Sequence, residues 1–313
     1  WESELAAQGI QHHKILDIDS KNPVTVLKLL YSIGQIIKNN EITIVHTHHR
    51  MAAFYIRLLK FVCPKLTHVY TAHNVFKDKL PLYRFALGNA KSVAVGEAVN
   101  KNLKEDVGIT DSKVIYNGVI LKKTDNQVDD IVGYDGTKLG CIARLSEQKG
   151  LTYLIEAMSL LTTKDIRLFI VGDGELRNEL ENKVEELHLQ DSVTFLGYRQ
   201  DIVECINSFD FLVSSSLFEG LALNIIEAFM NGKTMVATDI PGINEVVNDE
   251  NGILVPAKNP GALAGAIDKL ATDVLLKNRL AFHAQKTYEE KYSYPMFLEN
   301  YRALYREIQG EPK

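Results

Sequence analysis

Apolar positions along the chain recur in two periods, one typical of helices and one of strands. Asn22-Pro23 pairs a capping residue with a proline suited to a first helical position, and apolar residues then recur every three or four positions up to Ile37. Short apolar, β-branched runs alternate with helical segments after that. Repeated strand–helix units predict a parallel sheet, with strands expected at 42–45, 69–71, 92–95 and 113–116.

A polar stretch at 121–137 interrupts this pattern and predicts a linker or a long surface loop. The alternation then restarts, with strands expected at 139–143, 167–171, 192–196, 209–213, 234–237 and 253–255. The layout predicts an α/β protein of two doubly wound Rossmann-like domains that face each other across a cleft. We expect domains at 1–120 and 138–290, and a C-terminal helix within 291–313 that packs back toward the N-terminal domain.

Composition narrows the class of protein. The 313 residues have a formal charge of −5, which argues against a nucleic-acid binder that works by bulk charge. Three separated cysteines favour a reducing compartment, and neither a membrane span nor a signal peptide is visible. We therefore expect a cytoplasmic protein. Because the chain opens in mid-helix at Trp1, we also expect that its N-terminal domain lacks a first βα region.

The loops after the strands are where such folds bind ligands. In the first of these, at 143–150, Arg144 and Lys149 stand between a strand and a helix start, a position that suits an anion. The alternative is a pair of solvated surface charges. The loop by itself does not distinguish an anion site from a pair of solvated charges.

A second loop, at 214–228, carries Glu219 on a strand-to-helix turn and Glu227 inside the next helix. Backbone amides of residues 221–223 would open that helix and could hold a phosphate. The alternative is that Glu219 caps the helix and Glu227 is a solvated helix charge. Because Glu227 lies in a strongly apolar segment, we favour a functional role.

These segments resemble retaining glycosyltransferases of family 4. The resemblance rests on R-L-S-E-Q-K-G at 144–150, V-G-D-G-E-L at 171–176, F-L-G-Y-R at 195–199, E-G-L-A-L-N-I-I-E-A at 219–228 and A-T-D-I-P-G-I-N-E-V-V at 237–247. V-H-T-H at 45–48, T-A-H-N at 71–74 and V-I-Y-N-G-V at 114–119 are similar to the N-terminal half of that family. The resemblance implies the GT-B fold, with the nucleotide sugar held by the second domain and the acceptor by the first.

The resemblance also implies a role for each matching residue. Arg144, Lys149 and the amides of Leu221, Ala222 and Leu223 would contact the donor diphosphate, Glu227 the ribose, Tyr198 and Arg199 the base, Glu219 the donor sugar, and His73 the transferred sugar.

The implied activity is hexosyl or N-acetylhexosaminyl transfer from a nucleotide sugar, UDP-linked by preference, to a glycan or lipid-linked glycan. Capsule, exopolysaccharide or lipopolysaccharide synthesis would use such a step. Members of the family transfer with retention and without an essential metal, so cations and a helix start would stabilise the departing phosphate.

Departures from the family pattern keep two alternatives open. Gly96 replaces a serine, Ile120 an aspartate and Ala222 a glycine beside the phosphate. Without its first βα region the chain could be a non-catalytic module that binds a nucleotide sugar or partners a full-length enzyme. A nucleotide-sugar epimerase would need acid/base carboxylates that we cannot identify.

Three further patterns have simpler explanations. Asp17-Ile18-Asp19 imitates a D-x-D metal motif but lies away from the expected strand ends, so we expect a solvated loop. His46, His48 and His49 suggest a metal, yet alternate strand residues point to opposite faces and no cofactor is expected. The mixed basic and apolar stretch at 77–91 could contact the inner face of a membrane; the alternative is an ordinary surface helix.

Overall fold

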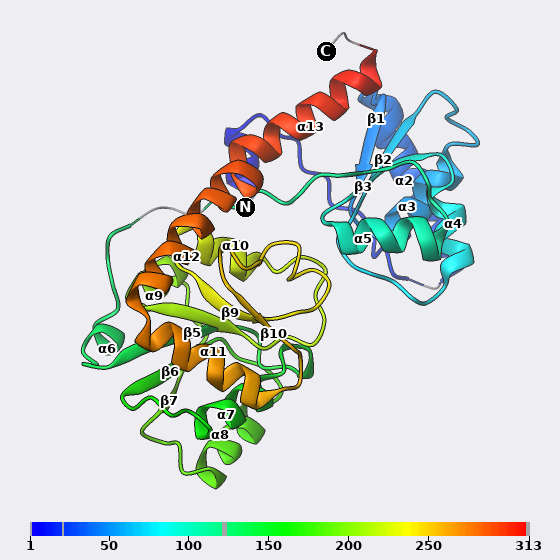
Figure 1. Cartoon of the computed structure of the whole chain (residues 1–313). Helices are drawn as coiled ribbons and strands as arrows, with labels where there is room; N and C mark the ends of the chain where they lie inside the picture. The colour runs from blue at the N-terminus through cyan, green and yellow to red at the C-terminus, as the bar shows by residue number, and fades with distance from the viewer. Residues whose placement is uncertain (1, 21, 121–123, 311–313) are drawn as a thin grey trace. The chain divides into compact units, whose positions relative to one another are not determined.

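A computed structural model of the chain describes residues 2–20, 22–120 and 124–310 (Figure 1). Parts of the expected linker (121–123) and of the expected C-terminal stretch (311–313) lie outside the described residues, as does Trp1. The chain divides into two compact units: unit 1 comprises 1–94 and 100–114, and unit 2 comprises 95–99 and 115–313.

Unit 1 contains a parallel four-stranded sheet in the order β1-β2-β3-β4. Helix α2 begins as expected at Pro23, because Asn22 Oδ1 accepts the Val24 amide at 2.9 Å directly before it. The elements of unit 1 are α1 (Glu2–Ala7), α2 (Pro23–Asn39), β1 (Ile44–Thr47), α3 (Arg50–Leu59), β2 (Thr67–Ala72), α4 (Leu80–Leu87), β3 (Ala90–Ala94), η1 (Leu103–Val107) and β4 (Ser112–Val114).

The helix expected after the third strand is divided in two. Its first part, α5 (Glu97–Asn102), spans residues of both units, and its second part is the π-helical turn η1. Gly108 ends this turn with φ +80°, a backbone conformation that glycine adopts without strain.

Unit 2 contains a parallel six-stranded sheet in the order β10-β9-β8-β5-β6-β7. Its strands are β5 (Thr137–Ile142), β6 (Ile166–Val171), β7 (Val193–Gly197), β8 (Phe211–Ser214), β9 (Met235–Thr238) and β10 (Ile253–Val255). Its helices are α6 (Asp129–Val132), η2 (Glu147–Lys149), α7 (Leu151–Ser159), α8 (Arg177–Glu186), α9 (Ile202–Ser208), α10 (Leu223–Met230), α11 (Pro260–Thr272), α12 (Val274–Thr287), η3 (Tyr288–Tyr292) and α13 (Tyr294–Gln309).

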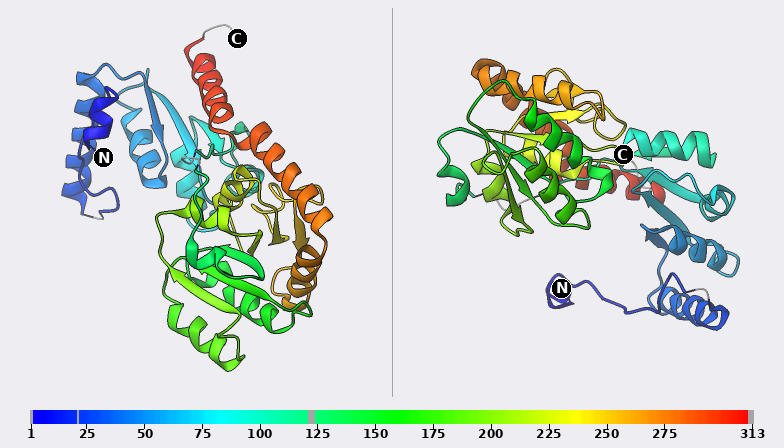
Figure 2. Two further views of the ribbon diagram at one scale, coloured as in Figure 1. Left: turned by 90° about the vertical axis from the view of Figure 1, so that its left-hand side faces the viewer. Right: turned by 90° about the horizontal axis from the view of Figure 1, so that it is seen from below.

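Helices cover both faces of the unit 2 sheet (Figures 1 and 2). Strand β6 shows why: Leu168 and Ile170 pack into one apolar cluster, while Phe169 and Val171 pack into another on the opposite face. Strands buried on both faces need continuous apolar runs, which is what the sequence has. The architecture is α/β with two parallel-sheet domains, as the sequence predicts.

The segment at 124–137 is part of unit 2, and its helix α6 packs against α9. Helix α6 lies within it, Ile131 is fully buried, and the Val128 amide donates to Ser208 Oγ at 2.8 Å. Val128 and Ile131 are thus apolar anchors in a stretch whose polar composition predicts only a loop.

Candidate functional site

The strand order of unit 2 reverses between β5 and β8. From β5 the chain continues to β6 and β7 on one side, and it returns to β8, β9 and β10 on the other. Chain connections leave in opposite directions at such a switch point, which opens a crevice outside the carboxyl ends of the two strands. The loops after β5 and β8 are the two that the sequence selects as candidate sites.

A cavity of about 880 Å³ lies at this place. Eight of the predicted site residues line it: Arg144, Lys149, Tyr198, Arg199, Glu219, Leu221, Ala222 and Leu223. They come from the loops after β5, β7 and β8, so the fold brings together residues that are up to 79 positions apart in the sequence.

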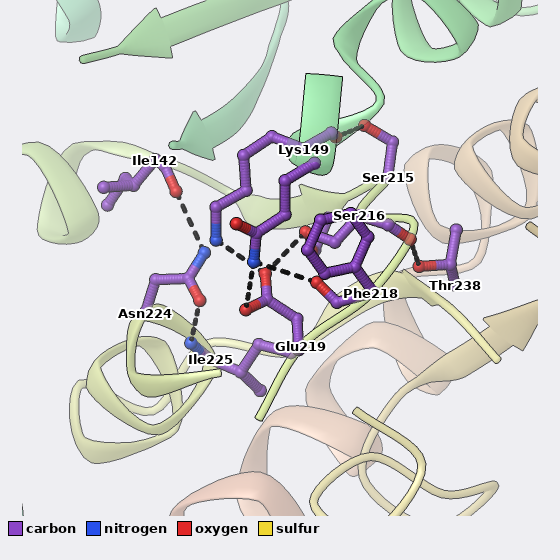
Figure 3. A network of polar contacts seen from close by, with 11 residues as sticks. Ile142, Lys149, Ser215, Ser216, Phe218, Glu219, Asn224, Ile225 and Thr238 are labelled. Atoms are coloured by element: carbon purple, nitrogen blue, oxygen red, sulfur yellow. Dashed lines mark hydrogen bonds and ion pairs between the residues drawn. The ribbon is translucent and has the colours of Figure 1, made fainter. Parts of the chain in front are cut away.

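A buried ion pair joins the two central loops. Lys149 Nζ lies 2.6 Å from Glu219 Oε1, and the side chains are 18% and 8% exposed (Figure 3). Ser216 Oγ donates to the same carboxylate oxygen at 2.8 Å, and Gln148 Nε2 donates to the other at 3.3 Å. A buried charge pair needs such additional hydrogen bonds to offset the loss of hydration.

Backbone contacts hold the lysine in place. Gly150 has φ +58°, and a Cβ atom there would lie 2.4 Å from the Ser215 carbonyl oxygen. The close approach lets Ser215 Oγ donate to the Lys149 carbonyl at 2.9 Å, and the Leu217 amide donate to the Gln148 carbonyl at 2.8 Å. Only glycine combines that conformation with that proximity.

The start of α10 faces the cavity. Ala222 precedes the helix and supplies no side-chain cap, and residues 221–224 line the cavity. First-turn amides of a helix favour an anion. Asn224 Nδ2 donates to the Ile142 carbonyl at 2.9 Å, which ties this helix to the end of β5 (Figure 3). Ala222 is 2% exposed and belongs to the apolar cluster beneath α10, so its methyl group takes little of the cavity.

Glu227 lies one turn further along α10 and is not among the residues that line the cavity. It is four positions after Leu223, so the two side chains share one face of the helix. The side chain is half-buried, and burial raises the pKa of its carboxyl group above the ordinary value.

The other predicted residues of unit 2 differ in exposure and in whether neighbouring charges hold their side chains. Arg144 is largely exposed and pairs with Glu175 at 3.1 Å. Arg199 is held by both oxygens of Asp201, at 2.9 Å from Nε to Oδ1. Tyr198 is 75% exposed and follows Gly197, whose φ is +70°. An exposed aromatic ring at a cavity rim is free to stack on a ligand.

Sequence reasoning misses five polar residues of this site. Asp173, Gln200 and Asn224 line the cavity, while Gln148 and Ser216 bind the Glu219 carboxylate. Gln148 lies inside the 144–150 motif, in which only the cations Arg144 and Lys149 indicate an anion site. Ser216 ends a run of three serines that begins with the last residue of β8, and all three are buried. A run of buried hydroxyls is a signal that their partners lie nearby.

In unit 1 the carboxyl ends of β1 and β2 carry a pair of histidines. His48 follows β1 and His73 follows β2, and His48 Nδ1 lies 3.0 Å from His73 Nε2. Burial lowers the pKa of both imidazoles, and the neighbouring His48 lowers that of His73 further. Both rings are therefore neutral near pH 7, and one must donate to the other.

The expectation that His46 and His48 point to opposite faces is wrong: residues two positions apart on a strand share a face, and the two ring centroids are 4.3 Å apart. Among the described residues no group of three or more His, Cys, Asp or Glu could hold a metal ion. His46 Nε2 lies 2.7 Å from Thr71 Oγ1, and Asp17 and Asp19 are exposed, with the Asp19 amide donating to Asp17 Oδ1 at 3.0 Å. In the described part of the chain no helix has the length and apolar character that crossing a membrane requires.

Comparisons with known proteins show which families the two parts of the chain match. Residues 2–123 match the family described as Glycosyltransferase Family 4, and residues 136–273 match the family described as Glycosyl transferases group 1. An uncharacterized glycosyltransferase of Methanocaldococcus jannaschii is 27% identical over 280 residues, which cover 80% of this chain and 72% of that protein.

Two further proteins are informative. The Escherichia coli UDP-Gal:alpha-D-GlcNAc-diphosphoundecaprenol alpha-1,3-galactosyltransferase is 26% identical over 80% of this chain and 72% of its own length. The crystal structure of Anabaena HepE in complex with UDP has a TM-score of 0.85 at 22% identity, covering 97% of this chain and 88% of that one. The chain therefore belongs to the GT-B glycosyltransferases, with a family 4 domain in its N-terminal part and a group 1 domain in its C-terminal part.

Proposed function

We propose that this protein is a retaining glycosyltransferase that moves a hexose or N-acetylhexosamine from a UDP-sugar to a glycan or lipid-linked glycan acceptor. The UDP complex of HepE supports the choice of base. The lipid-linked acceptor named for the Escherichia coli relative supports the acceptor class, and peripheral contact of 77–91 with a membrane is part of the same proposal. Surface polysaccharide synthesis is the process in which we expect the protein to act.

The observation that carries the proposal is the switch-point cavity, where Lys149, Glu219 and the start of α10 meet. We propose that Arg144, Lys149 and the amides of Leu221, Ala222 and Leu223 bind the diphosphate. Cleaving the anomeric C–O bond leaves new negative charge on the departing phosphate. Fixed cations and helix amides stabilise that charge without having to reorganise.

The remaining residues would position the nucleoside and the sugar. We propose that Glu227 accepts hydrogen bonds from the ribose hydroxyls, because a carboxylate can bind a vicinal diol in this way. Tyr198 and Arg199 would lie beside the base. Glu219 would orient the sugar hydroxyls, and Ser216 and Gln148 would keep its carboxylate in place.

The proposed chemistry balances without an external base. The acceptor hydroxyl bonds to the anomeric carbon, the bond from that carbon to the UDP oxygen breaks, and the hydroxyl proton passes to the departing phosphate. Attack on the face from which UDP departs gives retention. His73 would contact the transferred sugar, and we expect its loss to lower turnover while UDP affinity is kept.

Donor binding is tested by thermal unfolding of the chain with UDP, GDP or ADP. A ligand that binds only the native state adds about 2.7 kcal/mol at a hundredfold excess over Kd, which corresponds to several degrees. We expect a shift with UDP, and a smaller one with UDP in Lys149→Ala. Lys138→Ala is the matched control, because this half-buried lysine lies on β5 outside the cavity lining.

Transfer is tested separately with UDP-sugars and acceptor glycans. Lys149→Ala should lower kcat/KM at least tenfold, or about 1.4 kcal/mol, and the anomeric configuration of the product should be that of the donor. No shift with any nucleotide would overturn the donor site. A UDP shift without transfer to any acceptor would overturn the enzymatic part, and an inverted product would overturn the stereochemical part.

A further inference from the structure

The histidine pair of unit 1 is placed by the register of two strands. Strands β1 and β2 run parallel with Thr47 beside Tyr70, so both end at the same edge of the sheet. His48 is the first residue after β1, and His73 is the first after β2. The contact of 3.0 Å between His48 Nδ1 and His73 Nε2 therefore joins two loops that are 25 positions apart. The sheet, rather than the local sequence, brings the two rings together.

A second imidazole contacts the His48 ring. His46 lies two positions before His48, and the centroids of the two rings are 4.3 Å apart. His46 Nε2 lies 2.7 Å from Thr71 Oγ1 on β2, which ties the His46 ring to the neighbouring strand. His48 is exposed, yet its ring contacts one ring on β1 and another on the loop after β2. A side chain with two such neighbours has a defined position, from which it can orient one of them.

The contact between His48 and His73 occupies one of the two ring nitrogens of His73. A neutral imidazole has one N–H donor and one acceptor nitrogen, and burial lowers the pKa of both rings, so both are neutral near pH 7. Because His48 engages Nε2 of His73, a ligand of His73 would bind at Nδ1. The hydrogen bond at one ring nitrogen also sets which tautomer the ring adopts. His48 thereby controls both the direction of the His73 ring and the character of the nitrogen that it offers.

We propose that His48 is the positioning residue of His73: it holds the His73 ring at Nε2 and directs Nδ1 at the transferred sugar. The inference rests on the proposed function, in which His73 contacts that sugar. Without His48 the His73 ring can rotate about its side-chain bonds, and both tautomers become populated. A misplacement of about 1 Å at a reacting centre lowers turnover by up to about a hundredfold. Turnover is affected rather than nucleotide binding, because the cavity of unit 2 contains neither histidine among its lining residues.

Positioning differs from a direct contact between His48 and the substrate in what replaces the imidazole. The asparagine amide holds the place of Nδ1 and can bond to His73, but it lacks the far end of the imidazole ring. His48→Asn therefore keeps a positioning role and removes a contact made through Nε2. His48→Ala removes both.

Kinetics of the full chain with a UDP-sugar and an acceptor glycan give the first measurement. His48→Ala should lower kcat about tenfold, while KM for the donor and the UDP-induced thermal shift stay the same. His48→Asn should keep kcat within about threefold of the unchanged chain. His49→Ala is the matched control and should leave kcat unchanged, because this exposed neighbouring histidine precedes α3 and makes no capping hydrogen bond with its side chain.

Nitrogen NMR of isotope-labelled histidine rings gives the second measurement and needs no substrate. The two nitrogens of a single neutral tautomer differ widely in chemical shift, whereas a mixture of tautomers gives averaged shifts. The signals lost in His73→Gln identify the His73 ring. At pH 7 we expect a single tautomer of His73 in the unchanged chain and in His48→Asn, and averaged shifts in His48→Ala.

Three results would overturn the positioning role. The first is equal kcat in His48→Ala and His49→Ala, and the second is averaged shifts of His73 in the unchanged chain. The third is an equal loss of turnover in His48→Ala and His48→Asn, which would show that His48 itself contacts the substrate. If the unchanged chain binds no nucleotide and transfers no sugar, the proposed function fails, while the NMR comparison still decides whether His48 orients His73.

Discussion

In unit 2 the strand order reverses between β5 and β8, whereas in the described residues of unit 1 it runs from β1 to β4 without a reversal. The reversal opens a crevice, and the polar groups of unit 2 converge on it from three loops. The carboxyl edge of the unit 1 sheet carries instead the neighbouring histidines His48 and His73. The same strand–helix repeat thus gives a cavity lined by polar groups in one unit and neighbouring neutral imidazoles in the other.

The two units also differ in the charge state of their buried polar groups. Unit 2 pairs opposite charges, as in Lys149 and Glu219. Unit 1 buries imidazoles, and burial lowers the pKa of His46 and of His68 to about 4. Thr47 Oγ1 lies 2.8 Å from Nε2 of His68, which is 1% exposed. An ion pair tolerates mild acid, but a buried neutral histidine does not, because the unfolded chain takes up the proton first.

The largest expected effect is a loss of stability of unit 1 in mild acid. The pKa of His68 is about 4 in the folded chain and about 6.5 when unfolded, so its contribution is complete above pH 6.5 and is lost as the pH falls toward 4. One such histidine contributes about 3 kcal/mol over that window. Hydrogen exchange followed by mass spectrometry at pH 7 and pH 5, corrected for intrinsic rates, should show opening of unit 1 peptides before those of unit 2.

A variant tests the assignment to His68. His68→Gln keeps a hydrogen-bonding group for Thr47 and removes the titration, so the stability of unit 1 should depend less on pH. His188→Gln, at an exposed position of unit 2, is the control and should leave the pH profile unchanged. Equal acid sensitivity of unit 1 in His68→Gln and His188→Gln would contradict the assignment.

Much of the fold follows from local sequence, because apolar runs and caps are local signals. Each expected strand has a counterpart among the described residues, and helix α2 begins at Pro23 after its capping asparagine. Strand order is not a local property. Adjacent pairing of β5 and β8 depends on packing among elements about 70 residues apart, so the sequence cannot place the crevice without a family resemblance.

The candidate site likewise has residues that local sequence reveals and residues that only long-range contacts reveal. Arg144, Lys149 and Glu219 are visible in the sequence because they stand between an apolar strand and the start of a helix, where an anion could bind. Gln148 and Ser216 are ordinary polar residues, and their importance comes from the carboxylate that they contact 71 and 3 positions away. Val128 and Ile131, within a polar segment, are missed for the opposite reason: two apolar residues are too few to set a period, yet tertiary packing buries both.

A smaller effect on stability should follow from adding a side-chain atom where the loops after β5 and β8 touch. Gly150→Ala places a Cβ atom 2.4 Å from the Ser215 carbonyl oxygen, at a φ of +58°. The strained conformation and the contact together should lower the free energy of unfolding by about 2 kcal/mol. Because Lys149 precedes Gly150, UDP affinity should fall as well. Denaturant unfolding and nucleotide titration measure the two effects.

Gly265 in α11 provides the contrast. A Cβ atom there meets nothing within 4 Å, and alanine favours a helix by up to about 1 kcal/mol. Gly265→Ala should therefore stabilise unit 2 and leave UDP affinity unchanged. If Gly150→Ala were as stable as Gly265→Ala, the two loops would not be in the tight contact on which the position of Lys149 depends.

The smallest expected effect on stability concerns Glu227, where function and stability should oppose each other. Burial raises the pKa of its carboxyl group, so the folded state holds the proton more tightly than the unfolded state does. The stability from the protonated form is present below about pH 4.5 and is lost as the pH rises through the raised pKa. Glu227→Gln removes this loss, so at pH 7 it should be slightly more stable than the unchanged chain, by less than about 1 kcal/mol.

The same substitution should weaken UDP binding, because an amide offers one acceptor where a carboxylate offers two for the ribose hydroxyls. Glu250→Gln, at an exposed turn of unit 2, should change neither property. If the Glu227 carboxylate were only a solvated helix charge, Glu227→Gln would, like Glu250→Gln, change neither stability nor UDP affinity. A gain in stability together with a loss of affinity is expected only if the half-buried carboxylate on α10 is held there for a ligand.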